Sequence, residues 1–162
     1  SPIWSRGSAR NMRSTAGPCR DGSHVYNCTV ESSQATDLER LHALYGEWAR
    51  GDYSRGDIFD REIKSETIGM GDPIRAGNYE EFVAAMREWL SAWERPLMIE
   101  AEEYIQSGDR ILVLIHWRGR GKGSGAQIEG RGAHLWTFRE GLVVRFDTYR
   151  DRDQARAALG GG

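Results

Sequence analysis

The sequence predicts an α+β fold, in which helices dominate the first half of the domain and an antiparallel meander of strands forms the second. Apolar residues recur at helical spacing in 36–50 and again in 79–94. Four apolar stretches then follow between 97 and 149, separated by short turns rich in glycine and aspartate. Helices and strands that are segregated along a chain, rather than alternating, are typical of α+β domains.

The first helix is expected to begin at Thr36 or Asp37, since either side chain can cap a helix. Its apolar positions are Leu38, Leu41, Leu44, Tyr45 and Trp48. Gly51 ends it. Residues 53–60 are then expected to form a short helical turn and residues 63–70 a strand, because the latter alternate loosely between apolar and polar.

A second helix is expected over 79–94. Asn78 and Glu81 have the spacing of a capping box at its start, and Pro96 stops it. Its apolar stripe is Phe82, Met86, Trp89 or Leu90, and Trp93. A helical stripe normally faces a core, so we expect these side chains to pack rather than to bind a ligand.

The second half is expected to contain four strands and a terminal helix, over 97–106, 110–120, 127–139, 142–149 and 151–159. The segment 119–126 is rich in glycine and carries cations, which resembles a phosphate-binding loop. It fails that pattern because Gly123, not serine or threonine, follows Lys122. A flexible hairpin is the better interpretation.

Composition excludes several classes of protein. Hydrophobic residues make up 39% and charged residues 28% of the chain, as in globular proteins. With a formal net charge of −2, the chain lacks the excess of positive charge that binding to nucleic acid or to an anionic membrane surface requires. The longest apolar run, Ile111 to Ile115, is far shorter than the ~20 residues of a membrane span.

The two cysteines, Cys19 and Cys28, do not form a C-x-x-C pair. A zinc site would need two further ligands at suitable spacing, and the sequence offers none. We therefore expect neither a metal nor a cofactor. Few cysteines and no apolar signal-peptide core suit a reducing cytoplasm.

Residues 1–34 differ from the rest, since they are rich in serine, glycine and arginine and their apolar residues have no period. We expect them to be a poorly ordered extension or a cloning remnant, with one domain over 35–162. The alternative is an arm that packs on a partner subunit.

Three segments carry a family resemblance: Phe59-Asp60 before the first strand, the run from Trp136 to Phe146 at the last hairpin, and the run from Tyr149 to Ala155 at the end. Together they resemble the SnoaL-like branch of the nuclear transport factor 2-like superfamily, over about 36–160. The resemblance implies a cystatin-like α+β cone, in which a curved mixed or antiparallel sheet wraps around helices and leaves an internal pocket. It is weak for function, because the superfamily includes isomerases, epoxide hydrolases, cyclases and non-catalytic binders.

Strand alternation then predicts which side chains face that pocket. The residues expected to contact a ligand are Tyr45, Trp48, Phe59, Ser65, Thr67, Leu114, Trp136, Phe138, Phe146 and Thr148. On the strand over 110–120 we expect Leu112, Leu114 and His116 to face inward, and on the last strand Val144, Phe146 and Thr148. A slip of one residue would reverse each set.

At the positions that align with the superfamily's catalytic residues, this chain carries residues of other types. The base of the isomerases falls on Thr67 and their protonated acid on His134, with their tyrosine on Leu44, beside Tyr45. The aspartates of the epoxide hydrolases fall on Thr148 and His116. Neither activity is therefore carried over.

His116 and His134 are the candidate catalytic residues, because histidine can act as a general base near neutral pH. The alternative is that each is a core or rim residue with a hydrogen-bonded neighbour. Asp147 is expected on the outer sheet face together with Arg145 and Glu129, at a homodimer interface. If the register slipped, Asp147 or Glu66 would become a candidate base.

Three functions stay open. The first is a cofactor-free isomerase, hydrolase or cyclase that uses acid–base catalysis on a small apolar or cyclic molecule. The second is a non-catalytic binding or carrier domain with the same pocket. The third is a subunit that serves assembly through its outer sheet face. The missing carboxylates favour the second over a standard isomerase or hydrolase.

Overall fold

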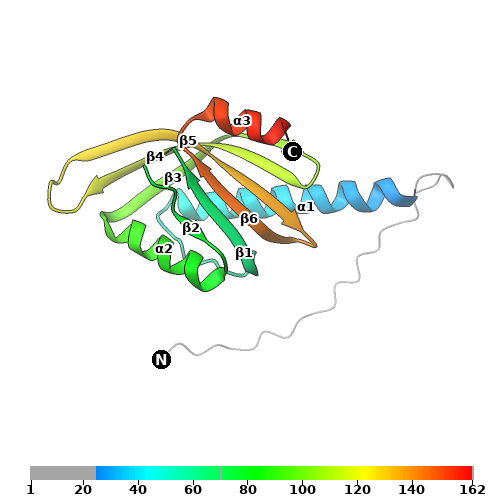
Figure 1. The fold of residues 1–162 in the computed structure, drawn as a ribbon, viewed down its shortest axis with the longest axis horizontal. Helices are drawn as coiled ribbons and strands as arrows, with labels where there is room; N and C mark the ends of the chain where they lie inside the picture. Colours follow the sequence, from blue (N-terminus) through cyan, green and yellow to red (C-terminus); the bar gives the residue numbers. More distant parts are fainter. Residues whose placement is uncertain (1–24, 70, 162) are drawn as a thin grey trace.

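The computed structural model describes residues 25–69 and 71–161, which form three helices and one six-stranded sheet (Figure 1). The helices are α1 (Val25–Trp48), α2 (Tyr79–Ser91) and α3 (Arg152–Gly160). The strands are β1 (Phe59–Ile68), β2 (Arg75–Ala76), β3 (Trp93–Ser107), β4 (Arg110–Gly121), β5 (Gln127–Arg139) and β6 (Leu142–Tyr149).

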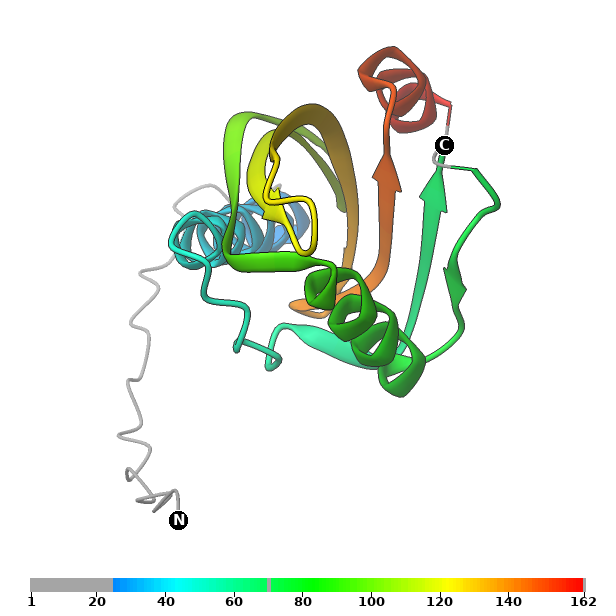
Figure 2. The ribbon, with the colours of Figure 1, turned by 90° about the vertical axis from the view of Figure 1, so that its left-hand side faces the viewer.

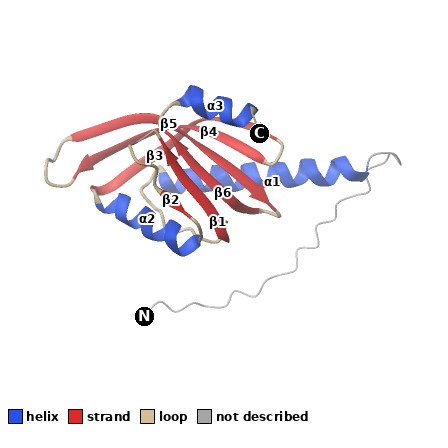
Figure 3. Ribbon diagram, viewed as in Figure 1, coloured by secondary structure: helices blue, strands red, loops and turns tan. Residues whose placement is uncertain are grey.

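The strands lie in the order β2-β1-β6-β5-β4-β3. Neighbours are antiparallel except β1 and β6, which are parallel, so the sheet is mixed. Figure 2 shows the sheet curling around α1 and α2, and Figure 3 shows α3 on the opposite side. This arrangement confirms the predicted α+β cone.

The inner face of the sheet packs against α1 and α2 in one core cluster. The sheet contributes Ile63, Ile99, Ile111, Val113, Ile115, Trp136, Phe138, Val143 and Phe146. The helix α1 contributes Leu41, Leu44, Tyr45 and Trp48, and α2 contributes Phe82. The helical spacing of the α1 residues explains why one face of that helix lies in the cone.

The outer face packs against α3 in a second cluster, formed by Leu112, Leu114, Ala133, Leu135, Tyr149, Ala155 and Leu159. Arginine side chains form hydrogen bonds to backbone carbonyl groups at both ends of α3. Arg152 donates to the carbonyl oxygens of Gly132 (3.1 Å) and Ile115 (2.7 Å), and Arg110 donates to those of Ala158 (3.0 Å) and Leu159 (2.7 Å). The Arg110 guanidinium thus satisfies carbonyls that a helix end leaves unpaired.

The expected orientation of β4 is wrong, because Leu112 and Leu114 lie in the outer cluster and Ile111, Val113 and Ile115 face the cone. The strand is apolar on both faces because helices cover both sides of the sheet. Alternation between apolar and polar residues, which normally reveals the buried face, is therefore absent.

A β-bulge alters β6. Phe138 pairs with Val143 and Thr137 with Arg145, so Val144 has no partner opposite it. Val143 takes the inward position that we expected for Val144, while Phe146 faces inward as expected. Pairing of Thr148 with His134 and with Thr67 places all three on the inner face.

Several boundaries differ from the expectation. The helix α1 begins at Val25, upstream of Thr36, since neither glycine nor proline interrupts the intervening sequence. Residues 53–58 are not helical, and Ile58 is buried. The helix α2 ends at Ser91, and Trp93 already belongs to β3. The expectation for residues 1–24 lies outside the described residues.

We predict that Arg110→Ala lowers the free energy of unfolding by about 1–2 kcal/mol, because two half-buried, charge-assisted hydrogen bonds to the end of α3 are lost. Arg156→Ala is the control, since its partner Asp153 is 94% exposed. It should cost less than about 0.5 kcal/mol. Urea unfolding followed by circular dichroism measures both, and equal effects would contradict the role of Arg110.

Candidate functional site

A chain of hydrogen bonds crosses the interior of the cone. The indole Nε1–H of Trp136 on β5 donates to the hydroxyl oxygen of Tyr45 on α1, at 2.9 Å. The same hydroxyl lies 2.6 Å from Nδ1 of His134, two residues before Trp136 on β5. The sequence placed all three residues on the inner face, and the structure brings them into contact.

Burial controls the protonation of this group. Burial lowers the pKa of His134 from 6.5 to about 3, so its imidazole is neutral at physiological pH. Burial also raises the pKa of Tyr45 well above its usual value, although the hydrogen bond from Trp136 acts in the opposite direction. Both side chains are therefore uncharged, and the site can offer hydrogen bonds but not a formal charge.

Aromatic rings enclose the pair. The His134 ring lies 4.9 Å from that of Phe146 and 6.0 Å from that of Trp48, between ring centroids. Tyr45 is 2% exposed and Trp136 is 0% exposed, so almost none of either side chain is accessible to water. At this point of the cone the protein's own aromatic rings surround the hydrogen-bonded group.

An open cleft of about 630 Å³ lies at the mouth of the cone. Its lining comes from the loop after α1, the end of α2, the start of β3 and the β4–β5 hairpin: Gly51, Asp52, Tyr53, Ser54, Arg87, Leu90, Ser91, Trp93, Glu94, Leu97 and Lys122. The cleft is thus lined by the segments that connect the helices to the sheet.

Tyr53 connects this cleft to the buried group. Its hydroxyl donates to the carbonyl oxygen of Leu97 at 2.6 Å, and its ring centroid lies 5.7 Å from that of Trp48. Trp48 in turn contacts His134. Two rings, those of Tyr53 and Trp48, therefore separate the cleft from the imidazole.

Three hydroxyl side chains share the inner face near His134. Ser65 and Thr67 on β1 pair with Phe146 and Thr148 on β6, and Thr148 pairs with His134. All three hydroxyl residues are half-buried. These inner-face positions of β1 and β6 carry alcohols, so they give His134 no acidic neighbour.

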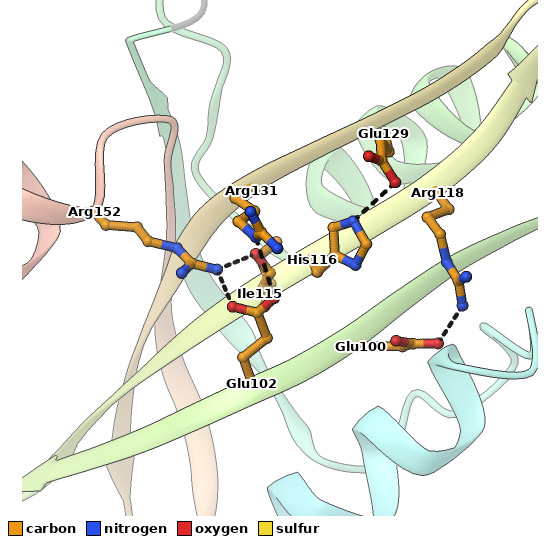
Figure 4. A network of polar contacts seen from close by, with 8 residues as sticks. All are labelled: Glu100, Glu102, Ile115, His116, Arg118, Glu129, Arg131 and Arg152. Atoms are coloured by element: carbon orange, nitrogen blue, oxygen red, sulfur yellow. Dashed lines mark hydrogen bonds and ion pairs between the residues drawn. The ribbon is translucent and has the colours of Figure 1, made fainter.

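His116 lies on the outer face, which contradicts the expected inward orientation. Its Nε2 is 3.3 Å from a carboxylate oxygen of Glu129, in the network of Figure 4. The reversed register of β4 explains this, since His116 has the parity of Leu112 and Leu114. The structure therefore separates His116 from His134, and the two do not form a pair.

The remaining predicted ligand contacts divide in the same way. Phe59 packs against the inner cluster, with its ring centroid 6.1 Å from that of Trp136, and Phe138 is buried in that cluster. Leu114 faces α3 instead. Asp147 is buried on the outer face, paired with Arg145 at 2.7 Å, and burial raises the pKa of its carboxyl group. The expected outward orientation of Asp147 is confirmed.

Two tryptophans near the cleft were missed as site residues. The rings of Trp93 and Trp117 lie 5.4 Å apart on the inner face of the β3–β4 ladder. Gly130 makes room for Trp117, since a Cβ atom there would lie 2.5 Å from Cζ2 of that ring. A Cβ atom at Gly119 would lie 2.6 Å from Cδ1 of Leu97 and 3.0 Å from Cε3 of Trp93. A glycine opposite a tryptophan on neighbouring strands was the signal available in the sequence.

Within residues 25–69 and 71–161, no group of three or more histidine, cysteine, aspartate or glutamate side chains is arranged to hold a metal ion. No helix in that part of the chain is long and apolar enough to cross a bilayer.

Comparison with known proteins identifies relatives. The model of the SnoaL-like domain family matches residues 30–146. No curated protein sequence matches the chain. A candidate SnoaL-like polyketide cyclase from Jannaschia sp. CCS1 is similar in structure, with a TM-score of 0.62 and 16% identity, over 80% of this chain and 94% of that one.

Two further solved structures share the fold. An NTF2-like protein of unknown function from Burkholderia pseudomallei K96243 has a TM-score of 0.62 and 19% identity, over 76% of this chain and 96% of that one. A phenazine biosynthesis-related protein from Pseudomonas aeruginosa has a TM-score of 0.63 and 12% identity, over 83% and 91%. Identities this low show a common fold only.

We predict that His134 makes stability depend on pH. The unfolded chain binds a proton on this histidine near pH 6.5, whereas the folded chain binds it near pH 3. The unfolded state therefore holds more protons between these values, and the free energy of unfolding falls as pH decreases from 7 to 4, by up to about 1.4 kcal/mol per pH unit from this residue.

Urea unfolding at several pH values tests this. His134→Gln should lose this part of the pH dependence while keeping an acceptor for Tyr45, and His116→Gln on the outer face should keep it. A pH dependence that is the same in His134→Gln as in the unaltered chain would show that His134 titrates normally in the folded state.

Proposed function

Because the chain belongs to the SnoaL-like family, whose members share this cone, we propose that it binds a small, flat, mainly apolar molecule at the mouth of the cone. The observation that carries the proposal is the position of the open cleft, two rings away from the buried hydrogen-bonded pair of Tyr45 and His134. The cleft supplies apolar surface, and the pair supplies a polar contact for the inner end of the ligand.

The cleft has the size and chemistry of a small-molecule site. A volume of about 630 Å³ falls within the range of ~300–1,000 Å³ that is usual for such sites. Tyr53, Trp93 and Leu97 offer aromatic and aliphatic surface, which suits a flat ligand. Arg87 and Lys122 are exposed cationic residues in the lining, where they can meet a polar substituent.

Access to the pair requires side chains to move. Trp48 is 2% exposed, and its ring lies between His134 and Tyr53. Rotation of the Tyr53 and Trp48 rings would extend the cleft toward the imidazole. The ligand then replaces ring–ring contacts with its own rings, which keeps the interior packed and dry.

The structural relatives support a cyclic ligand. Two of them are named for polyketide cyclisation and phenazine biosynthesis. Both names concern ring compounds, and an aromatic cleft in this chain suits compounds of that shape.

Cofactor-free acid–base catalysis is the second candidate function. It is favoured by the 2.6 Å hydrogen bond between Tyr45 and His134, which is the kind of contact that orients a catalytic histidine. It is weakened by the alcohols of Thr67 and Thr148 at the superfamily's carboxylate positions. A binding domain returns its ligand unaltered, whereas an enzyme converts it, and product analysis after release separates the two.

We also propose that a second copy of the chain covers the outer face of β3, β4 and β5. This face carries a groove of about 770 Å³ and a band of paired charges. Glu100 bonds Arg118 at 2.6 Å (Figure 4), and Glu94 lies 3.9 Å from Arg120. Both signs alternate across the strands, so two copies related by a two-fold axis can exchange partners.

We predict that Ser91→Trp abolishes binding at the cleft, because a bulky ring at this exposed lining position fills the space. Ser107→Trp, at the exposed end of β3 outside the cleft lining, is the matched control and should bind normally. Titration with 2-acetylnaphthalene, followed by amide chemical shifts, measures both. Shift changes confined to residues outside the cleft and the cone would overturn the proposed site.

For the outer face, we predict that Arg118→Glu weakens self-association at least tenfold, since like charges then face each other beside Glu100. Glu88→Arg on the exposed part of α2 is the control. Sedimentation velocity over a concentration series measures the association. A chain that stays monomeric at all concentrations, or an interface insensitive to Arg118→Glu, would refute this arrangement.

A further inference from the structure

The direction of the hydrogen bonds around Tyr45 can be assigned from the donors that each group carries. The indole nitrogen of Trp136 is a donor only, so the Tyr45 oxygen accepts from it. The Tyr45 hydroxyl has one proton of its own to donate. Its only other hydrogen-bonding partner among the described residues is Nδ1 of His134, at 2.6 Å.

The imidazole must therefore accept at Nδ1. If Nδ1 carried the proton instead, it would donate to the Tyr45 oxygen, and the buried Tyr45 proton would be left without an acceptor. Buried donors are rarely left unsatisfied, because the group has lost its hydrogen bonds to water. The proton of the neutral imidazole consequently lies on Nε2, to which no described residue is hydrogen-bonded.

We infer that the chain Trp136→Tyr45→His134 fixes His134 as a hydrogen-bond donor through Nε2–H, so that the cone selects ligands with a carbonyl-type oxygen at their inner end. This inference rests on the proposed binding function and names its ligand class. It also reverses the role that the sequence suggested for His134, since a nitrogen that already carries a proton cannot remove one from a ligand.

The surroundings of His134 agree with this assignment. The ring packs against Phe146, Trp48 and Trp136, which are poor hydrogen-bonding partners for Nε2–H. The nearby hydroxyls of Thr67 and Thr148 can donate as well as accept. A ligand oxygen between them and Nε2 would be met by donors, whereas a ligand that only donates would find no strong anionic acceptor.

Nitrogen-15 NMR of the histidine side chains tests the assignment without a ligand. In the unaltered chain we expect the proton of His134 on Nε2 and a bare Nδ1. Trp136→Phe should leave this tautomer unchanged, because the bond from Tyr45 remains. Tyr45→Phe should produce a mixture of tautomers, because Nδ1 loses its donor. A proton on Nδ1 in the unaltered chain would overturn the inference.

Two flat probes that differ in one atom test the ligand class. 2-Acetylnaphthalene carries a carbonyl oxygen, and 2-isopropenylnaphthalene has a CH₂ group in its place. The ratio of their dissociation constants should shift on the order of fivefold against the ketone in His134→Phe, which keeps an aromatic ring at this position. His116→Gln on the outer face should leave the ratio unchanged.

The outcomes separate this inference from the proposed function. If both probes bind at the cleft and His134→Phe leaves their ratio unchanged, the binding function stands and the selection of carbonyl ligands is refuted. If neither probe binds the unaltered chain, the proposed function and the ligand class fail together, while the NMR experiment still decides the tautomer.

Discussion

The hydrogen bonds from Trp136 to Tyr45 and from Tyr45 to His134 join α1 to the middle of the sheet, and all three side chains are buried. Polar atoms in such a space cost stability unless they are paired, so α1 must lie at the height and rotation that place its tyrosine between the two strand residues. The aromatic rings then pack around this fixed point. The shape of the cone, the neutrality of His134 and the shielding of the pair from the cleft all follow from that arrangement.

The second constraint is that the sheet is covered on both faces. The helix α3 lies on the outer face, where Arg152 and Arg110 hold its two ends through backbone carbonyls. This explains why β4 is apolar at every position from Ile111 to Ile115, and why His116, just beyond that run, emerges among charged residues. The outer face thus divides into an apolar part under α3 and a charged part over β3, β4 and β5, which suits packing on one side and recognition on the other.

Much of this could be predicted from the sequence, for identifiable reasons. The strands after residue 97 are bounded by turns with clear signals. At the end of β5, Trp136, Thr137 and Phe138 alternate between apolar and polar, which places Trp136 and, two residues earlier, His134 inward. The parity of β4 could not be predicted, because both of its faces are buried and no alternation marks either one. The bulge at Val144 was equally hidden, since an inserted residue leaves no mark in an apolar run. The closure of the cone by Trp48 and Tyr53 depends on ring packing between distant segments, which periodicity does not report.

The most direct measurement is a double-mutant cycle between Tyr45 and His134, with Tyr45→Phe and His134→Phe made singly and together and the free energy of unfolding measured at pH 7. If the hydrogen bond between them organises the interior, the two substitutions should be coupled by about 1–2 kcal/mol, because each alone removes the same bond. Additive effects, with a coupling within about 0.3 kcal/mol of zero, would show that these rings merely fill space and that the cone does not depend on their contact.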